Sequence, residues 1–408
     1  MSDVLFLAHR IPFPPDRGDK IRSFNILRGI GRHARVHLAC FADDGADAAQ
    51  LPALREAMEG SLGEAHVEVR RGTALGAARA LACGRPLSLA LFEGPALQDF
   101  VDRMLAQREI GTIFAFSAQM AQFVPADVGA RFIMDFADMD SAKFAGYGAA
   151  GLGPRAWIYR REAGRLLAHE RAVAQRADLS LFVSEAEAQL FREGTGLTAN
   201  IAALENGVDL GFYDSAAAFP RLTPGQRGQG PLIVFTGQMD YRPNVEAVTS
   251  FAHDVMPLIL REAPNARFAI VGRKPAAAVR RLDASRSTLV TGAVADVRSW
   301  LDAADVVVAP LTIARGVQNK VLEAMAMARP VVATSAAFEG IAAVAGRDLL
   351  VADGSDTQAA AVLRLLRDPA EAAAIAAAAR RRMEAAYSWS ARLAALPEML
   401  GRPARRAA

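Results

Sequence analysis

Short runs of apolar residues alternate with amphipathic segments along most of this chain. The runs are rich in Val, Ile, Leu and Phe, without the strict alternation of a strand that has one exposed face. Continuous apolar strands separated by helices are typical of parallel sheets that are buried on both faces. We expect strands at residues 4–8, 35–41, 67–69, 110–116, 131–136, 179–183, 232–236, 267–271, 289–290, 306–310 and 331–334.

Helical periodicity fills most of the intervals, for example at residues 20–30, 245–261, 319–328 and 391–400. The alternation occurs twice, and a stretch rich in Pro, Gly and Ala at residues 216–230 lies between the two halves. A turn signal at residues 206–209 precedes this stretch. The sequence therefore predicts two doubly wound α/β domains, residues 1–205 and residues 206–388, with a central cleft that holds two substrates.

Composition narrows the class of protein. The chain has 408 residues, of which 52% are hydrophobic and 22% are charged, as in a globular protein. Its two cysteines, Cys40 and Cys83, lack metal-ligand spacing and form no disulfide framework. The sequence shows neither an apolar run of roughly 18 residues nor a signal-peptide pattern. We therefore expect a cytoplasmic protein, and a net charge of +3 gives little support to nucleic-acid binding.

Residues 306–334 carry the most informative chemistry. A buried strand there is followed by a glycine-containing turn and by a helix that begins near Gln318. The N–H groups and the dipole of a helix N-terminus favour a phosphate group. Lys320 adds a positive charge where the dipole alone favours an anion, and Glu323 lies one turn further, within reach of a ribose diol. The alternative is a solvated lysine and glutamate on a surface helix.

Residues 314–334 as a whole resemble the donor-nucleotide motif of glycosyltransferase family 4, which belongs to the GT-B superfamily. The flanking segments 290–305 and 183–209 agree with this resemblance. More narrowly, four segments resemble the sugar transferases that accompany the exosortase/PEP-CTERM surface-protein system, namely residues 12–20, 135–141, 235–244 and 314–320.

The resemblance implies a GT-B fold of two Rossmann-like domains and a hexosyltransferase-like activity. The second domain would bind a UDP- or GDP-sugar, and the first an exopolysaccharide or lipid-linked acceptor at the inner face of the inner membrane. Residues 389–408 would pack back on the first domain. Transfer would retain the anomeric configuration without a metal or other cofactor. We predict a donor site formed by Gly18, Gly237, Arg242, Gly272, Arg273, Gly316, Gln318, Asn319, Lys320 and Glu323.

The sequence departs from the family pattern in its charged residues. The family usually carries Glu-x7-Glu, with the second glutamate on the ribose, but Arg315 stands where the first is expected. An arginine and a lysine of the family's second domain are likewise replaced by Gln238 and Asn244. We expect Arg242, Arg315 and Lys320 to supply the missing positive charge.

In the first domain, Gly18 would let the backbone approach a diphosphate, because glycine has no Cβ atom. His9 is expected beside this loop, at the end of the first strand. Asp138 and Asp140 follow a buried strand, where they either hold a metal ion or, as we prefer, serve the acceptor. We predict that Asp138, Asp140, Arg315 and Lys320 are catalytic, and that the acceptor side includes Asp19, Lys20, Asp135 and Ser141. The alternative for Asp19, Lys20, Asp140 and Ser141 is helix capping.

Residues 155–176 form a predicted basic amphipathic helix, rich in arginine and with Trp157 and Tyr159 near its start. An ordinary solvated helix face explains it most simply, and contact with an anionic membrane or a lipid phosphate is the sharper hypothesis. Two other functions remain open for the whole chain. One is a sugar-nucleotide epimerase of the same fold, and the other is a non-catalytic sugar-nucleotide-binding protein, which the missing glutamate favours.

Overall fold

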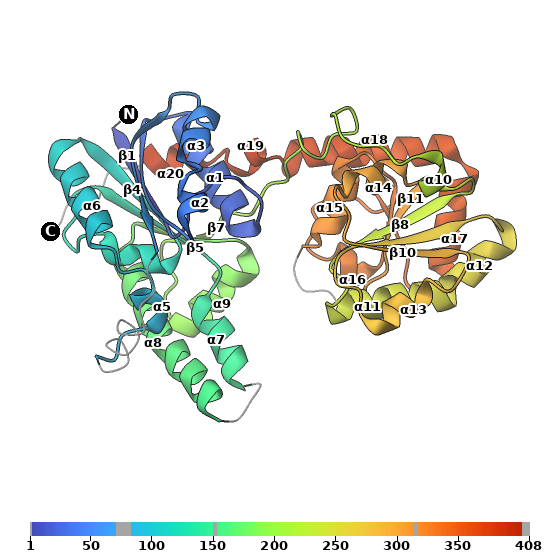
Figure 1. Cartoon of the computed structure of the whole chain (residues 1–408), viewed down its shortest axis with the longest axis horizontal. Coiled ribbons are helices and arrows are strands. Elements are labelled where there is room, and N and C mark those ends of the chain that lie inside the picture. Colours follow the sequence, from blue (N-terminus) through green and yellow to red (C-terminus); the bar gives the residue numbers. More distant parts are fainter. Residues whose placement is uncertain (1, 71–82, 150–152, 313–316, 402–408) are drawn as a thin grey trace. The chain divides into compact units, whose positions relative to one another are not determined.

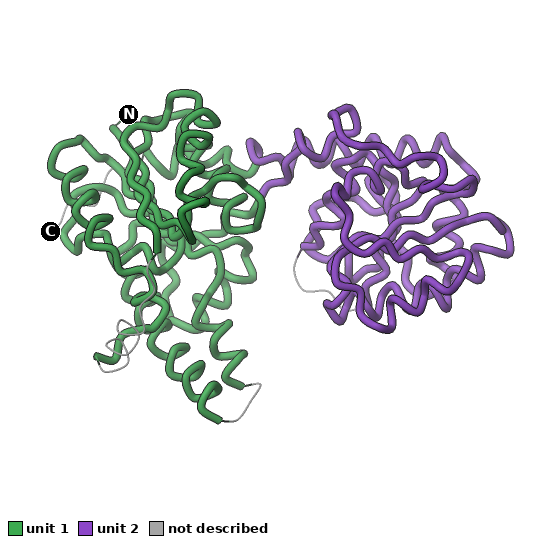
Figure 2. Tube along the Cα trace, viewed as in Figure 1, with its two compact units in different colours: residues 1–206, 392–408 green, residues 207–391 purple. Residues whose placement is uncertain are grey.

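A computed structural model describes residues 2–70, 83–149, 153–312 and 317–401. The chain forms two compact units, one made of residues 1–206 with 392–408 and the other of residues 207–391 (Figure 2). Each unit has its own parallel sheet, and neighbouring strands in both sheets run in the same direction. The predicted fold class of two doubly wound parallel-sheet α/β domains is confirmed.

Unit 1 contains a seven-stranded sheet in the order β3-β2-β1-β4-β5-β6-β7. Its middle strands are fully buried because they carry almost only apolar side chains, as in Leu5, Phe6 and Leu7 of β1. The order reverses between β1 and β4, so the loops that follow these two strands diverge and leave space at the edge of the sheet. The strands are β1 (Asp3–Ala8), β2 (Val36–Ala42), β3 (Leu62–Val69), β4 (Ile110–Phe116), β5 (Arg131–Ala137), β6 (Leu179–Phe182) and β7 (Ile201–Ala203).

Helices connect these strands, and most pack against the sheet (Figure 1). The exceptions are α7 and the start of α8, which extend away from the sheet as a hairpin (Figure 1). The helices of this unit are α1 (Gly18–Gly31), α2 (Gly45–Ala48), α3 (Leu51–Ala57), α5 (Leu87–Ala90), α6 (Pro95–Gln107), a 3₁₀ helix (Ala118–Phe123), α7 (Asp140–Ala149), α8 (Pro154–Arg176), α9 (Glu185–Thr195) and α20 (Leu396–Gly401).

Unit 2 contains a six-stranded sheet in the order β10-β9-β8-β11-β12-β13. The order reverses between β8 and β11, which lie at the centre of an apolar core. Helices α14 and α18 lie on one side of this sheet, and α11 and α13 lie on the other (Figure 1). The strands are β8 (Leu232–Thr236), β9 (Arg267–Val271), β10 (Thr288–Gly292), β11 (Val306–Ala309), β12 (Val331–Ala333) and β13 (Leu350–Val351).

Residues 355–386 form two long helices, and most of the other helices in unit 2 are short. They are α10 (Pro224–Arg227), α11 (Arg242–Ser250), a π-helical turn (Phe251–Val255), α12 (Met256–Glu262), α13 (Ala277–Leu282), α14 (Arg298–Ala303), α15 (Asn319–Ala326), α16 (Ser335–Phe338), α17 (Ser355–Arg367), α18 (Pro369–Ala386) and α19 (Trp389–Arg392). Throughout the described ranges, no helix combines the length and the apolar character that a membrane span requires.

The segment after α18 returns to unit 1. An added Cβ on Gly29 of α1 would lie 2.8 Å from a side-chain carbon of Leu393 and 3.1 Å from one of Leu396, so α1 and this segment are closely packed. The predicted continuous helix at 391–400 is wrong, because α19 ends at Arg392 and α20 begins at Leu396. Pro397 explains the break, since proline has no N–H group to donate within a helix and is tolerated in the first turn.

Every predicted strand is present, with ends that differ by a few residues. Two strands, β7 and β13, escape prediction because three and two residues are too few to show a periodic pattern. The segment 216–230 also contains the short helix α10, which a capping box between Thr223 and Gln226 stabilises.

Candidate active site

A pocket of about 510 Å³ lies in unit 1 where β1, β4, β5 and β6 end. This is the point where the strand order reverses, and open α/β sheets bind ligands at such points. Polar residues dominate its wall, with Phe92, Phe116 and Phe136 between them. The polar and charged lining residues are His9, Arg10, Asp19, Arg22, Arg70, Ser117, Gln119, Asp138, Asp140, Lys143 and Asn206.

A buried ion pair forms the base of this pocket. Arg22 is 2% exposed and Asp135 is 0% exposed, and two hydrogen bonds of 3.0 Å join the guanidinium to the carboxylate. Arg22 also donates to the Leu204 carbonyl at 2.6 Å and to Asn206 Oδ1 at 2.9 Å. Burial raises the pKa of Asp135, and the facing guanidinium only partly opposes this. Asp135, which we predicted on the acceptor side, therefore lies beneath the pocket and ties α1 to β5.

One side of the pocket joins His9 and Arg10 at the end of β1 to Asp19 in α1. Arg10 Nη1 donates to Asp19 Oδ2 at 2.8 Å, and His9 Nε2 lies 3.3 Å from the same oxygen. Burial alone would raise the pKa of Asp19, but hydrogen bonds from His9 and Arg10 hold it well below its usual range. Gly18 lines this side as well, where an added Cβ would meet no atom within 4 Å. Close packing within unit 1 therefore does not require glycine there.

The opposite side holds the two predicted catalytic carboxylates. Lys143 Nζ donates to Asp138 Oδ2 at 2.8 Å and to Asp140 Oδ1 at 3.3 Å. Gln119 Nε2 also approaches Asp140 Oδ2, at 3.4 Å. Desolvation lowers the pKa of Lys143, but the two carboxylates outweigh it and raise that pKa above its usual value. In the described parts of the chain, no group of three or more His, Cys, Asp or Glu side chains gathers as metal ligands do.

The backbone is strained at this rim. Ser117, directly after β4, and Ala137, the last residue of β5, have φ of 79° and 62°, a region that residues with a Cβ atom rarely adopt. Hydrogen bonds to Asp135 hold both in place, because Ser117 N donates to its carbonyl at 2.8 Å and Ala137 N to its carboxylate at 3.0 Å. Such strain costs about 1–3 kcal/mol per residue and is concentrated at functional sites.

Two further predicted acceptor residues lie outside the set that lines the pocket. Lys20 is buried, and its ammonium group donates to Asp47 Oδ1 at 2.5 Å. Ser141 is buried as well, and its hydroxyl donates to Glu170 Oε2 at 2.5 Å. Burial raises the pKa of Glu170 to about 7. Both contacts hold helices together within unit 1.

In unit 2, the turns that follow β8 and β9 approach each other closely. An added Cβ on Gly272 would lie 1.6 Å from the carbonyl oxygen of Gly237, so no other residue fits this backbone. An added Cβ on Gly237 would lie 2.8 Å from Asn244 Nδ2, which itself donates to the Gln238 carbonyl at 2.9 Å. Close packing therefore explains why glycine occupies positions 237 and 272 of the predicted donor site.

Gln238 and Asn244, the two amides singled out in the sequence, each contact a cation from another element. Lys320, in the first turn of α15, donates to Asn244 Oδ1 at 3.1 Å and to Gln318 Oε1 at 3.2 Å. Arg273 donates to Gln238 Oε1 at 3.2 Å. Burial lowers the pKa of Lys320 to about 8, against the opposing charge of Glu323. Arg273 and Lys320 therefore place positive charge beside the two neutral amides.

Arg242 lies apart from this group. Its side chain is 87% exposed and pairs with Glu246 of the same helix at 2.7 Å. Asn319 begins α15 next to its N-cap residue Gln318, as predicted for the helix start. Arg315 and Gly316, two further predicted site residues, lie outside the described residues.

Glu323 lies one turn along α15 and forms a hydrogen bond with the hydroxyl of Tyr213. Burial raises the pKa of Glu323 to about 7, against the effects of Tyr213 and Lys320. Tyr213 is a residue that the sequence analysis missed, because it precedes the first strand of unit 2 and belongs to no motif. Only the fold brings it to Glu323.

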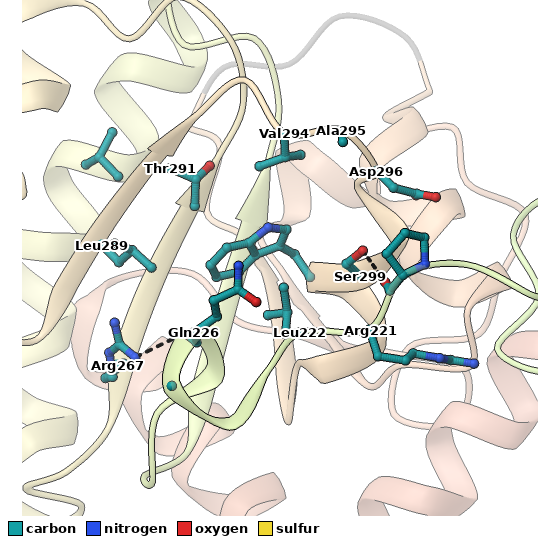
Figure 3. Close-up of a pocket in the computed structure, with 14 residues that line it drawn as sticks. Arg221, Leu222, Gln226, Arg267, Leu289, Thr291, Val294, Ala295, Asp296 and Ser299 are labelled. Atoms are coloured by element: carbon teal, nitrogen blue, oxygen red, sulfur yellow. Dashed lines mark hydrogen bonds between the residues drawn. The ribbon is translucent and has the colours of Figure 1, made fainter.

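Unit 2 has a pocket of about 660 Å³ between β10, α14 and residues 220–226 (Figure 3). Leu289 and Thr291 project into it from β10, and Leu222 and Gln226 approach from the other side (Figure 3). None of the predicted site residues lines this pocket. It is therefore separate from the group around Lys320.

Comparison with known proteins gives a family match and a fold match. Residues 230–368 match the family described as Glycosyl transferases group 1. A GDP-mannose-dependent monoacylated alpha-(1-6)-phosphatidylinositol monomannoside mannosyltransferase of Corynebacterium glutamicum is 26% identical over 238 residues. That alignment covers 54% of this chain and 61% of the mannosyltransferase, which is less than two thirds of its length.

The sucrose-phosphate synthase of Thermosynechococcus elongatus superposes with a TM-score of 0.61 at 15% identity, over 98% of both chains. HepE of Anabaena in complex with UDP superposes with a TM-score of 0.60 at 16% identity, over 98% of this chain and 99% of that one. These likenesses show that the fold is GT-B, as predicted. Together with the family match, they support a GT-B glycosyltransferase.

Proposed function

We propose that this protein is a family 4 glycosyltransferase that transfers a sugar from a UDP- or GDP-sugar to an exopolysaccharide or a lipid-linked acceptor. The match of residues 230–368 to a glycosyltransferase family carries the proposal, because the residues around Lys320 lie within it. The Corynebacterium relative is named as GDP-mannose-dependent, and HepE binds UDP, so both nucleotides are candidates. The narrower assignment, to the sugar transferases of the exosortase/PEP-CTERM system, rests on the sequence resemblance.

In this proposal the donor binds where β8, β9 and α15 meet. Lys320 and Arg273 face the diphosphate, and the N–H groups at the start of α15 add their partial positive charge. Gly237 and Gly272 leave the backbone bare where the phosphates approach. Glu323 accepts hydrogen bonds from the ribose hydroxyls, and Tyr213 holds its carboxylate in position.

The reaction needs negative charge to be stabilised on the departing nucleoside diphosphate. Lys320 suits this task because its hydrogen-bond partners are neutral amides. A preorganised cation in a site that excludes water stabilises such charge without further reorganisation. These groups act without a metal ion in the proposed mechanism, and the family resemblance supports retention at the anomeric carbon.

The acceptor would occupy the pocket of unit 1. Carboxylates, cations and three aromatic rings line this pocket, which matches a sugar with hydroxyl groups at its edges and apolar faces. Asp138 and Asp140 would accept hydrogen bonds from acceptor hydroxyls, with Lys143 compensating their charge. Asp19 and His9 would contact the acceptor from the other side of the pocket. We place the enzyme in the cytoplasm, at the inner membrane surface.

Calorimetric titration with UDP, GDP and their sugar conjugates tests the donor site. We expect selective binding of one nucleotide, weakened about 10- to 100-fold by Glu323→Ala and about fivefold by Tyr213→Phe, since the hydrogen bonds removed are worth roughly 1–3 kcal/mol. Glu193→Ala, an exposed glutamate of unit 1, is the matched control and should bind like wild type.

A folded protein that binds no nucleotide would contradict the proposal. Incubation of the donor with membrane extract then separates the remaining functions. Transfer of sugar to extract components supports the glycosyltransferase, whereas an isomerised donor would indicate an epimerase. Binding without turnover would indicate a non-catalytic protein.

A further inference from the structure

Unit 1 carries a surface that the proposed reaction does not use. Helices α7 and α8 pack side by side and extend away from the sheet as a hairpin (Figure 1). Aromatic side chains gather near its end, where Tyr147 and Tyr159 have ring centroids 5.7 Å apart and Phe144 and Tyr159 have centroids 6.0 Å apart. Trp157 lies near the start of α8. We call Phe144, Tyr147, Trp157 and Tyr159 the aromatic tip.

The aromatic tip is unusually open to solvent. Tyr147 is 59% exposed and Trp157 is 58% exposed, the two highest values among the large exposed apolar side chains of the described residues. Such rings combine an apolar body with a polar group, and they favour positions between water and hydrocarbon. Tyr147 and Trp157 thus present two amphipathic rings near the end of the hairpin, and the described fold leaves both largely uncovered.

The charge along α8 has one sign on its exposed side. Both glutamates of this helix are buried, because Glu162 accepts hydrogen bonds from Leu87 N and Ser88 N, and Glu170 accepts from Ser141. The exposed charges of α8 are therefore arginines, namely Arg155, Arg160, Arg165 and Arg171. An ordinary solvated helix face mixes both signs, whereas this one resembles a site for anions.

Trp157 and three of the four exposed arginines share one face of α8, whereas Tyr159 faces α7. At about 100° per residue, Trp157, Arg160, Arg165 and Arg171 fall within an arc of about 140°, opposite Glu162, Leu166 and Val173, which are buried. Gly164 and Ala168 lie on the same exposed arc, so only small side chains separate the arginines. A helix with this pattern can lie along a flat anionic surface.

We propose that the α7–α8 hairpin docks on an anionic lipid bilayer, with the aromatic tip at the headgroup level and the arginines of α8 against lipid phosphates. Tryptophan and tyrosine are enriched at membrane interfaces, and each basic residue near an anionic surface strengthens binding about fivefold. The pattern of one-sign charge beside exposed aromatic rings fits a bilayer better than a protein groove, which would need a shaped apolar cavity.

The position of the hairpin links this surface to the acceptor pocket. α7 begins at Asp140, which lines the pocket, and its ten residues span ~15 Å at about 1.5 Å per residue. Docking at the tip would therefore hold the pocket close to the headgroups, where the sugar of a lipid-linked acceptor would lie. This part of the inference rests on the proposed function, whereas the binding of lipid does not.

Vesicle sedimentation tests the docking without any sugar transfer. The full chain should bind vesicles of phosphatidylcholine with phosphatidylglycerol and lose that binding to phosphatidylcholine alone or at high salt. Tyr147→Ala with Trp157→Ala should weaken binding about tenfold. Arg165→Gln with Arg171→Gln should weaken it about 25-fold, at about fivefold per charge.

Matched substitutions in unit 2 control for loss of an exposed ring or of charge. Tyr241→Ala, with a side chain that is 56% exposed, and Arg261→Gln with Arg381→Gln should bind vesicles like wild type. Tryptophan fluorescence adds a direct readout, because Trp300 and Trp389 are buried and Trp157 is exposed. Anionic vesicles should shift the emission to shorter wavelength, and Trp157→Phe should abolish the shift.

No binding of the wild type to anionic vesicles would overturn the docking proposal, as would binding that the hairpin variants leave unchanged. Nucleotide titration of the same variants keeps the two proposals apart. Hairpin variants that lose lipid binding but retain nucleotide affinity support docking and show that they are folded. A wild type that binds lipid but no nucleotide would support docking while contradicting the proposed donor site.

Discussion

The polar groups at the strand ends of unit 1 and of unit 2 have different partners, although both units use a parallel sheet with a reversal of strand order. In unit 1 the cations face carboxylates, as Arg22 faces Asp135, Lys20 faces Asp47, and Lys143 faces Asp138 and Asp140. In unit 2, Lys320 donates hydrogen bonds to two neutral amides, Asn244 and Gln318. Carboxylates therefore accept hydrogen bonds from these cations of unit 1, whereas the hydrogen-bond partners of Lys320 are uncharged, as the donor site that we propose requires.

The pKa values reflect this difference. Burial lowers the pKa of Lys320 to about 8, because its amide partners do not offset the loss of water. For Lys143, two carboxylates more than offset desolvation and raise the pKa. A cation that the fold leaves undercompensated is costly without its ligand, which is expected at a binding site and not at a structural ion pair.

The largest expected effect is on stability in unit 1. Arg22→Met leaves Asp135 buried without its partner, and we expect the free energy of unfolding to fall by about 3–5 kcal/mol. Urea denaturation measures the change. Arg17→Met, whose guanidinium is exposed, is the control and should change stability by less than about 1 kcal/mol. An unchanged midpoint for Arg22→Met would show that the pair does not hold α1 to β5.

The second expected effect is on catalysis in unit 2. Lys320→Met should reduce sugar transfer by about 10²–10³-fold, because the charge on the departing diphosphate loses its stabilising cation. Stability should not fall, since a desolvated lysine is removed. The same substitution in unit 1, Lys20→Met, should lower stability while donor affinity stays unchanged, because Lys20 pairs with Asp47. Steady-state kinetics and urea denaturation measure both effects. Equal losses of activity and of stability in the two variants would contradict the difference between Lys320 and Lys20.

A smaller effect is expected in the pH dependence of stability. The pKa of Glu323 rises from 4.5 to about 7 on folding, so the native protein binds a proton that the unfolded chain lacks between these values. Stability should therefore fall as pH rises from about 4.5 to about 7, by roughly 3 kcal/mol at this residue. Glu323→Gln should remove that part of the slope, as measured by urea denaturation at several pH values.

Tyr213→Phe provides the opposite control for this slope. Removing the hydroxyl takes away a hydrogen bond that favours the ionised carboxylate, so the pKa of Glu323 should rise further and the slope should extend to higher pH. A slope that neither substitution changes would mean that another buried group, such as Glu170, causes it.

Local sequence patterns were sufficient for most of the fold. Long apolar strands such as β1, β4 and β8 were found within a residue of their ends, because each is buried on both faces and therefore apolar throughout. The start of α15 was also found, since a glycine-containing turn and a helix pattern mark it. The strands β7 and β13 are held by their neighbours in the sheet and leave no pattern of their own.

Local sequence patterns could not predict which side chains contact each other. Nothing local distinguishes Lys20, which is buried against Asp47, from Lys320, which faces two amides, since both lie in the first turn of a helix after a glycine-containing loop. Tyr213 and Glu323 are far apart in the sequence, and no spacing rule joins them.

The amino-acid sequence by itself determined the parallel-sheet class, the division into two α/β domains and the start of α15, because burial on both faces and helix periodicity are local properties. The tertiary structure decided which cations face carboxylates and which face neutral amides. It paired Arg22 with Asp135, brought Arg273 and Lys320 to the two amides, and turned both glutamates of α8 inward, so that the exposed charges of that helix are positive. Electrostatic partners are set by distances in space, and these depend on how segments remote in the sequence pack together.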